Sequence, residues 1–362
     1  MGMVAEPKVG LPATATARAH PNLALVKYWG RRDPALNLPA NGSISLNLSG
    51  AVTTTTVAFD RTQVADKVAI NGKLADDVAQ RRVTAHLDQV RALAHFTYRA
   101  TVVSDNSFPT SAGVASSSSA FAALTRAAVA AAGLELSLRE LSILARKGSG
   151  SAARSIPDGF VEWLPGRDDE SSYAFSLAPC DHWDLHVVTV AWPLGPKAVS
   201  SLAGHDAAST SPFYEARLAS LPRTLDRVRE AITQRDLGAL GMVVEREAMS
   251  LHAVAMTSYL ADRPWMSGVT YFAPETTRMI HTVQEWREGG LEVYFTLDAG
   301  PSIHLLCAAC DVAQVMRAVQ ESVDPGAASI LVSRAGRGAW LVNGTGGAGG
   351  PAGEQSLDVA VG

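Results

Sequence analysis

The sequence predicts an α+β protein built from two domains with a cleft between them. Helices of moderate length alternate with strands in both halves of the chain. With 362 residues the chain can bury two sizeable cores, and it has no internal repeat of solenoid period. We therefore expect a first domain at residues 1–182, a second at 183–342, and a flexible glycine-rich tail at 343–362.

The composition excludes several classes of protein. Hydrophobic residues make up 47% and charged residues 18%, as in ordinary globular proteins. A net charge of -4 without a dense basic run argues against nucleic acid as a partner. The apolar runs are too short for a membrane span, and the N-terminus has no secretory signal. The cysteines, which fit a reducing cytoplasmic compartment and complete no metal site, are Cys180, Cys307 and Cys310.

The first half begins with strands. Residues 14–20 alternate in the manner of a strand. Asn41-Gly42 predicts a hairpin turn between strands at 36–38 and 43–48. Residues rich in threonine and valine predict further strands of a mixed sheet at 52–59 and 68–70.

Two amphipathic helices are expected in this half. Residues 136–146 predict a helix capped by Ser137, because Glu140 stands three residues further on and completes a capping box. Residues 76–94 predict another helix, whose apolar face is formed by Val83, Leu87, Val90 and Leu93.

A segment rich in small residues at 104–120 lies between an apolar extended run at 100–103 and a helical run at 121–132, which ends at Gly133. Small side chains let backbone N–H groups approach an anion, and a helix start adds unpaired donors. Serine hydroxyls can supplement those donors or bind a phosphate-bound Mg²⁺. The segment is typical of a phosphate-binding loop, although it lacks the Gly-Lys-Ser/Thr of the Walker pattern. An ordinary serine-rich start of a buried helix explains the composition equally well.

Two other polar segments are candidates for a site. Residues 20–33 crowd charged side chains around Tyr28-Trp29, which predicts the wall of a partly buried pocket, although a surface loop could carry the same charges. Residues 147–155 repeat the glycine and serine composition and add Arg154. A strand is expected directly afterwards, at 160–164.

The second half continues the alternation of helices and strands. The predicted elements are a strand at 185–192, a loop at 193–211, helices near 212–233 and 235–256, an irregular aromatic segment at 264–274, a helix near 275–288, a strand at 291–298, a helix near 311–322 and a strand near 329–334.

Four segments together resemble the mevalonate diphosphate decarboxylase family of the GHMP (galactokinase, homoserine kinase, mevalonate kinase, phosphomevalonate kinase) superfamily. They are residues 22–33, 106–117, 146–155 and 295–301, the last containing Asp-Ala-Gly-Pro. The resemblance implies a ribosomal-S5-like N-terminal domain, a ferredoxin-like C-terminal domain, and ATP and substrate in the cleft. It also implies phosphorylation of a tertiary alcohol by ATP, followed by loss of phosphate and CO₂.

The resemblance implies roles for individual residues. Asp298 would orient or deprotonate the hydroxyl, Arg154 would hold the substrate carboxylate, and Lys27 would lie near the reacting centre. Tyr28 and Arg31 would reach the 5-phosphate end of the substrate. The competing explanations are structural: a helix-capping aspartate, a surface arginine and a solvated lysine.

The remaining implied contacts come from the small-residue segments. Ser149 and Ser151 would bind substrate together with Arg154. The ATP phosphates and their Mg²⁺ would be held, without a separate protein metal site, by Ser104, Asn106, Gly113, Ser116, Ser117 and Ser118. Structural or rim positions are expected for His20, His205, His252 and His304.

The substrate we expect is mevalonate 5-phosphate, converted to isopentenyl phosphate, CO₂, ADP and phosphate. Arg31 stands where the family usually has lysine, but an arginine can bind one or two phosphates, so this position does not decide the substrate. Residues 199–206 lack the usual Gly-Met and an arginine for a second phosphate. The four-serine run and residues 204–208 and 265–274 look more like the branch that acts on the monophosphate. The alternatives are the 5-diphosphate as substrate, a mevalonate 3-kinase, and a non-enzymatic metabolite-binding module. A homodimer is suggested by family alone.

Overall fold

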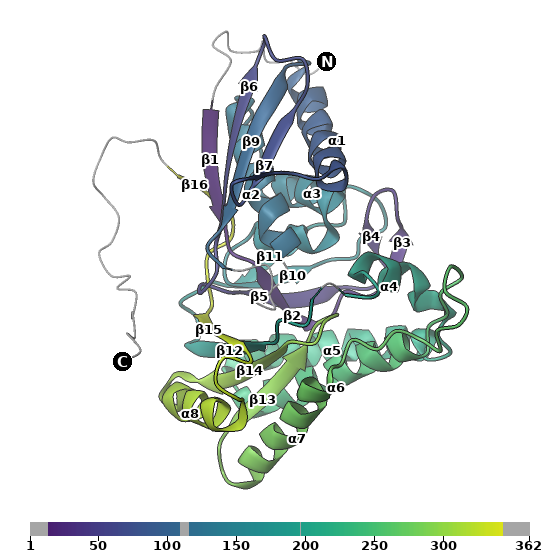
Figure 1. The fold of residues 1–362 in the computed structure, drawn as a ribbon, viewed down its shortest axis with the longest axis vertical. Coiled ribbons are helices and arrows are strands. Elements are labelled where there is room, and N and C mark those ends of the chain that lie inside the picture. The colour runs from purple at the N-terminus through teal and green to yellow at the C-terminus, as the bar shows by residue number, and fades with distance from the viewer. Residues whose placement is uncertain (1–13, 109–115, 196, 343–362) are drawn as a thin grey trace.

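The computed structural model describes residues 14–108, 116–195 and 197–342. Sheets and helices alternate through both halves of the chain, which confirms the predicted α+β class (Figure 1). The predicted tail at 343–362 and Gly113 lie outside the described residues.

A mixed sheet is built from strands of the first half together with one strand from residues 340–342, at the end of the described chain. Its strands run antiparallel to their neighbours except for the parallel pair β7–β9, which confirms the expected mixed sheet. In spatial order the strands are β16 (Trp340–Val342), β1 (Thr14–Ala19), β6 (Thr53–Asp60), β9 (Arg99–Asn106), β7 (Lys67–Ile70) and β8 (Lys73–Leu74).

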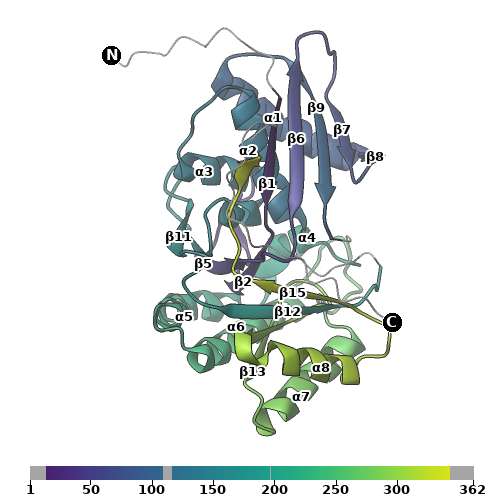
Figure 2. The same cartoon turned by 90° about the vertical axis from the view of Figure 1, so that its left-hand side faces the viewer.

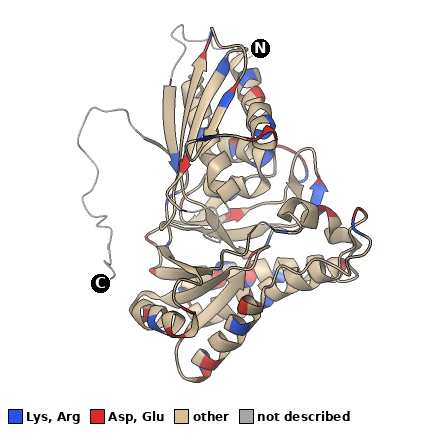
Figure 3. Cartoon of the chain, viewed as in Figure 1, with Lys and Arg blue, Asp and Glu red and all other residues tan. Residues whose placement is uncertain are grey.

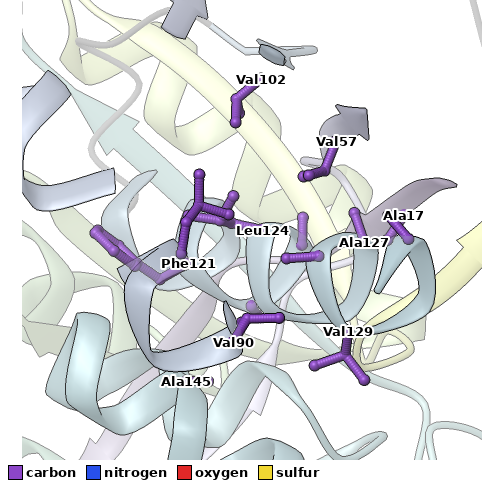
Figure 4. Packing of buried hydrophobic residues seen from close by; sticks show 14 of the residues in the cluster. Ala17, Val57, Val90, Val102, Phe121, Leu124, Ala127, Val129 and Ala145 are labelled. Carbon is purple, nitrogen blue, oxygen red and sulfur yellow. The ribbon is translucent and has the colours of Figure 1, made fainter. Parts of the chain in front are cut away.

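Helices α1 (Asp77–Ala94), α2 (Ser116–Ala131) and α3 (Leu138–Gly148) build a core against this sheet. Figure 4 shows side chains of α2 meeting those of the strands and of neighbouring helices in this core. Helix α3 begins with the expected capping box of Ser137 and Glu140. Leu93 was expected in the apolar face of α1 but is 49% exposed. Ten residues after Val83, at 100° per residue, it lies about 80° from the centre of that face.

A second sheet lies between the first sheet and the second half. Its strands, in order, are β11 (Ala174–Ala178), β10 (Phe160–Trp163), β5 (Ser43–Asn47) and β2 (Asn22–Val26). A 3₁₀ helix, η1 (Gly150–Ser155), packs beside it. The strand β2 therefore has one edge with no neighbouring strand among the described residues.

The predicted hairpin at Asn41-Gly42 is wrong. The strand β4 (Leu38–Pro39) pairs with β3 (Arg31–Asp33), whereas β5 pairs with β2 and β10. Asn41 is buried, and its Nδ2 donates to the carbonyl of Lys27 at 2.9 Å and to that of Gly42 at 2.7 Å. The asparagine side chain thus holds a neighbouring segment rather than forming a tight turn.

The second half contains an antiparallel sheet covered by helices. Its strands, in order, are β13 (Val293–Leu297), β14 (Ile303–Ala308), β12 (Leu185–Ala191) and β15 (Ser329–Arg334). The helices of this half are α4 (Ser201–Ala207), α5 (Tyr214–Gln234), α6 (Leu237–Met256), α7 (Pro274–Glu288) and α8 (Val312–Ser322), with short 3₁₀ turns η2 (Ala208–Thr210) and η3 (Ala309–Asp311).

The segment at 193–211, expected to be a loop, contains the two-turn helix α4. Ser200 caps it by accepting a hydrogen bond from the N–H of Ala203. Gly204 lies in the middle of this helix, where the ring of Trp29 and the hydroxyl of Tyr271 pack closely against it. A side chain does not fit there, because a Cβ would lie 2.5–2.6 Å from these two groups. A central glycine in so short a helix hides the helical pattern in the sequence.

The two halves share a hydrophobic core. Leu23 and Ile44 of the second sheet pack in one cluster with Leu221 of α5, Leu240 of α6 and Leu306 of β14. Figure 2 shows β2 and β5 lying directly over the sheet and helices of the second half. The junction is therefore packed as a protein interior is.

Positively and negatively charged residues are interspersed along the ribbon of both halves (Figure 3). Among the described residues, no helix is long and apolar enough to cross a membrane.

Candidate active site

A cavity of about 640 Å³ lies where the two halves meet. The first half contributes residues at and after β2, in η1 and at the start of α2. The second half contributes α4, the segment after β12, and the residues after β13. The polar residues that line it include Asn22, Lys27, Tyr28, Ser117, Ser151, Arg154, Lys197, His205, Asp298 and His304.

Lys27 and Asp298 form an ion pair across this junction. Lys27 follows β2 and Asp298 follows β13, and Nζ lies 2.8 Å from Oδ1. Lys27 is almost fully buried, and its Nζ also donates to the carbonyl of Ala24 at 2.6 Å. The Asp298 side chain is 31% exposed. The carboxylate can therefore meet a ligand in the cavity while the ammonium holds it from behind.

Burial by itself would raise the pKa of Asp298, but Lys27, His304 and Arg154 hold that pKa below its ordinary value. Burial lowers the pKa of Lys27, against the opposing effects of Asp298 and Glu247. Asp298 is thus a carboxylate at neutral pH. It can accept a hydrogen bond or a proton from an uncharged hydroxyl.

Arg154 lines the same cavity from η1, where it is 3% exposed. Its Nη1 donates to Ser43 Oγ at 2.7 Å, and its Nε and Nη2 donate to Asn22 Oδ1 at 3.3 and 3.1 Å. Burial lowers the pKa of Arg154 to about 10, which leaves it charged at neutral pH. Its direct hydrogen-bond partners are neutral, so its charge remains available to an anion.

Tyr28 and His205 stack on each other beside this group, with ring centroids 4.2 Å apart. The ring of Trp29 also packs against His205, with centroids 4.5 Å apart. The N–H of Gly30 donates to His205 Nδ1 at 3.1 Å, so the neutral ring carries its hydrogen on Nε2. Burial, together with nearby arginines, lowers the pKa of His205 to about 3. His205 is therefore a neutral hydrogen-bond donor at the edge of the cavity.

Arg31 was expected at the phosphate end of the substrate, but its donors are engaged elsewhere. Its Nη2 and Nε donate to Asp206 Oδ1 at 2.5 and 3.0 Å, and its Nη1 donates to Asn37 Oδ1 at 3.1 Å. Arg31 is not among the described residues that line the cavity, whereas its neighbour Tyr28 is. The structure thus places a carboxylate on the cation that was expected to bind phosphate.

Of the serines expected to contact a ligand, two are among the described residues that line the cavity and the others are not. Ser117, in the first turn of α2, and Ser151, in η1, line the cavity. Ser149 caps the end of α3, and its hydroxyl lies 3.5 Å from that of Ser151. Ser116 is the first residue of α2, and Ser118 is buried, with its Oγ 3.4 Å from the N–H of Asn22.

Ser104 and Asn106 are not brought to the described lining of the cavity. The Ser104 hydroxyl lies 2.9 Å from that of Thr55, and Asn106 Oδ1 accepts from Thr53 Oγ1 at 2.7 Å. Both bonds join β9 to β6. An ATP-binding role for these two residues stays a prediction.

The polar lining residues that were not predicted as site residues include Asn22, Lys197, His205 and His304. Asn22 orients Arg154 by accepting its hydrogen bonds. Lys197 donates to the carbonyl of Ala299, next to Asp298. His304 lines the cavity from β14, and its Nδ1 lies 2.9 Å from Thr189 Oγ1. Lys197 lies in a proline-rich segment with no periodic pattern. Asn22 begins the segment 22–33, one of the four that carry the family resemblance, and that position is the sequence signal that could have found it.

Comparison with known proteins now identifies the family. The diphosphomevalonate decarboxylase-like N-terminal domain matches residues 19–174, and the mevalonate 5-diphosphate decarboxylase C-terminal domain matches residues 188–336. The chain belongs to the mevalonate diphosphate decarboxylase family. This confirms the predicted family and the predicted class of enzyme, a decarboxylase.

Relatives within the family differ in the substrate that they are named for. A phosphomevalonate decarboxylase of Haloferax volcanii is 33% identical, with 80% of this chain and 87% of that protein covered. A diphosphomevalonate decarboxylase of Bos taurus is 32% identical, with 86% and 80% covered.

Solved structures of the family share the fold. A structure described as MDDEF in complex with MVAPP, AMPPCP and magnesium is 36% identical, with a TM-score of 0.84 over 92% of this chain and 99% of that one. Mevalonate diphosphate decarboxylase of Staphylococcus aureus is 35% identical, with the same TM-score over 91% and 98%. The predicted two-domain GHMP-kinase-like fold is confirmed.

Proposed function

We propose that this decarboxylase acts on mevalonate 5-phosphate, with ATP as co-substrate, and releases isopentenyl phosphate, CO₂, ADP and phosphate. The observation that carries the choice of substrate is the Arg31–Asp206 pair. A second phosphate group would add negative charge, whereas Asp206 already neutralises the cation nearest the expected phosphate end. A monophosphate needs fewer cationic donors, and the neutral Nε2–H of His205 suits it.

Asp298 and Arg154 act on different groups of the substrate: Asp298 on the C3 hydroxyl and Arg154 on the carboxylate. A tertiary hydroxide is a poor leaving group, so the C3 hydroxyl must first become a phosphate ester. Asp298 accepts the hydroxyl proton as the oxygen attacks the terminal phosphoryl group of ATP. The C3–O bond then breaks and phosphate leaves, while the electron pair of the bond to the carboxylate forms the C=C bond and releases CO₂. Arg154 orients that carboxylate through its guanidinium.

The residues present fit a nucleotide with its magnesium ion. The described part of the chain holds no cluster of three or more His, Cys, Asp or Glu side chains able to bind a metal. Mg²⁺ bound to nucleotide phosphates needs few protein ligands, and it supplies neutralisation of phosphate charge. Ser117 offers a hydroxyl at the start of α2, and Lys197 adds an ammonium to the same cavity. We assign binding of the ATP phosphates to Ser117 and Lys197.

The second candidate substrate is mevalonate 5-diphosphate. It is favoured by the bovine relative, which is named diphosphomevalonate decarboxylase, and by the structure described with MVAPP. The deep part of the cavity serves either substrate, because the hydroxyl and the carboxylate that react are the same.

The deciding experiment incubates the purified protein with ATP and Mg²⁺ and offers mevalonate, its 5-phosphate or its 5-diphosphate, with ADP and CO₂ measured in each reaction. We expect both products in equal amounts, with the highest kcat/KM for the 5-phosphate. A higher kcat/KM for the diphosphate would establish the second candidate. Formation of ADP without CO₂ would identify a kinase and overturn the decarboxylation step.

A further inference from the structure

The backbone of Lys27 lies at an open sheet edge. Lys27 directly follows β2, the edge strand of its sheet, so its N–H and C=O have no neighbouring strand on that side. Lys27 is 1% exposed, so water does not reach these groups freely. Buried backbone groups without partners are costly. Asn41 of the first half donates to the C=O at 2.9 Å, so the N–H is the group that most needs a partner from the second half.

A buried ion pair from the second half supplies this partner. Glu247 Oε1 of α6 accepts from the N–H of Lys27 at 2.7 Å. Arg217 Nη2 of α5 donates to the carbonyl of Lys27 at 2.9 Å and to Glu247 Oε1 at 2.6 Å. The two side chains thus hold the donor and the acceptor of one residue, as a paired strand would.

The same helix also holds the strand that leads to Asp298. Glu245 Oε1 of α6 accepts from the N–H of Phe295 at 3.0 Å, three residues before Asp298. Arg287 Nη1 donates to that carboxylate at 2.7 Å. Two glutamates on one helix, each supported by an arginine, therefore hold the two backbone segments that end in Lys27 and Asp298.

The Arg217–Glu247 pair is not arranged for stability alone. Arg217 Nε and Nη1 are buried and have no hydrogen-bond partner among the described residues. A buried ion pair contributes little net stability even when all its groups are satisfied, and unpaired donors reduce that contribution further. Its contacts are concentrated instead on one residue of the cavity.

We propose that the Arg217–Glu247 pair is a positioning device that fixes the backbone of Lys27 and thereby sets the contact of its ammonium with Asp298. The inference rests on the proposed role of Asp298 and is independent of the number of phosphates on the substrate. Without the pair, the ammonium would be held less closely to the carboxylate. The carboxylate of Asp298 would then be positioned less precisely for the substrate hydroxyl, and its pKa would rise.

The test removes both charges together. The variant Arg217→Met/Glu247→Leu leaves no unpaired buried charge, so it should fold. We expect kcat to fall about tenfold, with KM for ATP within about twofold of wild type. The pKa of Asp298, followed by ¹³Cγ NMR with its signal assigned by Asp298→Asn, should rise by about half a unit to one unit. The acidic limb of the kcat profile should move with it.

The charged and titratable groups around Asp298 do not change in this variant. They come from β2, η1, the segment after β12, α6 and β14, and are Lys27, Arg154, Lys197, His252 and His304. Because Glu247 also raises the pKa of Lys27, a shift in the pKa of Asp298 would report a change in the placement or the charge of Lys27, and not the loss of one of the groups around Asp298.

The chain offers a matched control. Glu162 of β10 is 2% exposed and accepts from Arg229 Nε and Nη2 of α5 at 2.8 and 2.6 Å, so it also forms an ion pair between the halves. The control variant Arg229→Met/Glu162→Leu should leave kcat and the pKa of Asp298 within error of wild type. A shift as large as that of the Arg217 and Glu247 variant would overturn the proposal.

A milder variant keeps the proposal testable if the double variant does not fold. Arg217→Lys keeps a positive charge beside Glu247, so neither buried charge is left unpaired, but it loses the planar guanidinium whose Nη2 bonds both Glu247 and the carbonyl of Lys27. It should give a smaller shift of the pKa in the same direction. An unchanged pKa and an unchanged kcat in a folded variant would overturn the positioning role. Separately, unchanged turnover in both Lys27→Met and Asp298→Asn would overturn the proposed chemistry, which distinguishes the two failures.

Discussion

Two regions at the cavity differ in how their arginines are held. The deep end contains the buried, cavity-lining Arg154, and the rim contains Arg31, which lies outside the described lining beside the half-exposed Asp206. At the deep end, Arg154 is held by Asn22 and Ser43, which are neutral. At the rim, Arg31 is held by Asp206, which carries a full negative charge. Both guanidiniums are ordered by hydrogen bonds.

The difference concerns where the positive charge goes. Neutral partners fix the direction of a guanidinium and leave its charge for a ligand, whereas a carboxylate takes up both the donors and the charge. Arg154 can therefore bind an anionic ligand directly. Arg31 can do so only after its ion pair with Asp206 is broken. Four experiments test how these two regions work.

The largest effect is expected from Asp298→Asn. Asparagine keeps the size of the side chain but cannot take the hydroxyl proton. We expect kcat to fall by about a thousandfold, while the affinity for the phosphorylated substrate stays within about threefold. Single-turnover ADP release and substrate titration measure the two quantities. Retained turnover would reject Asp298 as the base.

Arg154→Met tests the anion-binding capacity of the deep end. The lost contact is to the substrate carboxylate, so we expect kcat/KM for CO₂ release to fall about a hundredfold. Affinity for an ATP analogue should change by less than about twofold, because the nucleotide phosphates are assigned to other residues. Equal losses in both measurements would show that Arg154 is misplaced in the proposal.

Asp206→Asn tests the rim. Removing the carboxylate frees Arg31, so we expect kcat/KM for the 5-diphosphate to rise about tenfold relative to the 5-phosphate. The gain should disappear in Arg31→Met/Asp206→Asn. Asp226→Asn, which removes an exposed carboxylate from Arg229 on α5, is the matched control and should leave the ratio unchanged. A gain that persists without Arg31 would contradict the explanation.

The smallest effect concerns pH. Burial and the nearby arginines hold the pKa of His205 at about 3, below its unfolded value of about 6.5. The unfolded chain therefore binds more protons, and the stability from a neutral His205 is complete above pH 6.5 and declines as pH falls toward 3. His205→Gln should reduce the slope of unfolding free energy against pH by up to about 1.4 kcal/mol per unit between pH 6 and 4.5. Urea titrations at each pH measure it.

Much of the fold could be predicted because its signals are local. The capping box at Ser137 and Glu140 and the helix stop at Gly133, where φ is +69°, depend on a few adjacent residues. Helix α4 and the hairpin were misjudged because Gly204 and Asn41 are selected by contacts with distant residues, which adjacent sequence does not reveal.

The site could be predicted in its reacting groups but not in its supporting ones. Lys27, Arg154 and Asp298 stood in recognisable motifs, and the structure brings all three to one cavity. The partners that decide their availability lie far away in the chain. Arg31 and Asp206 are 175 residues apart, and Lys27 and Glu247 are 220 apart. Pairings at such separations are set by packing of the two halves and leave no periodic trace.

The dependence of β2 on helices of the second half has a consequence for dissecting the chain. A fragment that ends before β12 would lose β16 from the first sheet, and it would leave the edges of β1 and β2 and the apolar face around Leu23 uncovered. Bare strand edges recruit other strands. Such a fragment, expressed by itself, would therefore self-associate, and adding the second half in trans should restore its solubility.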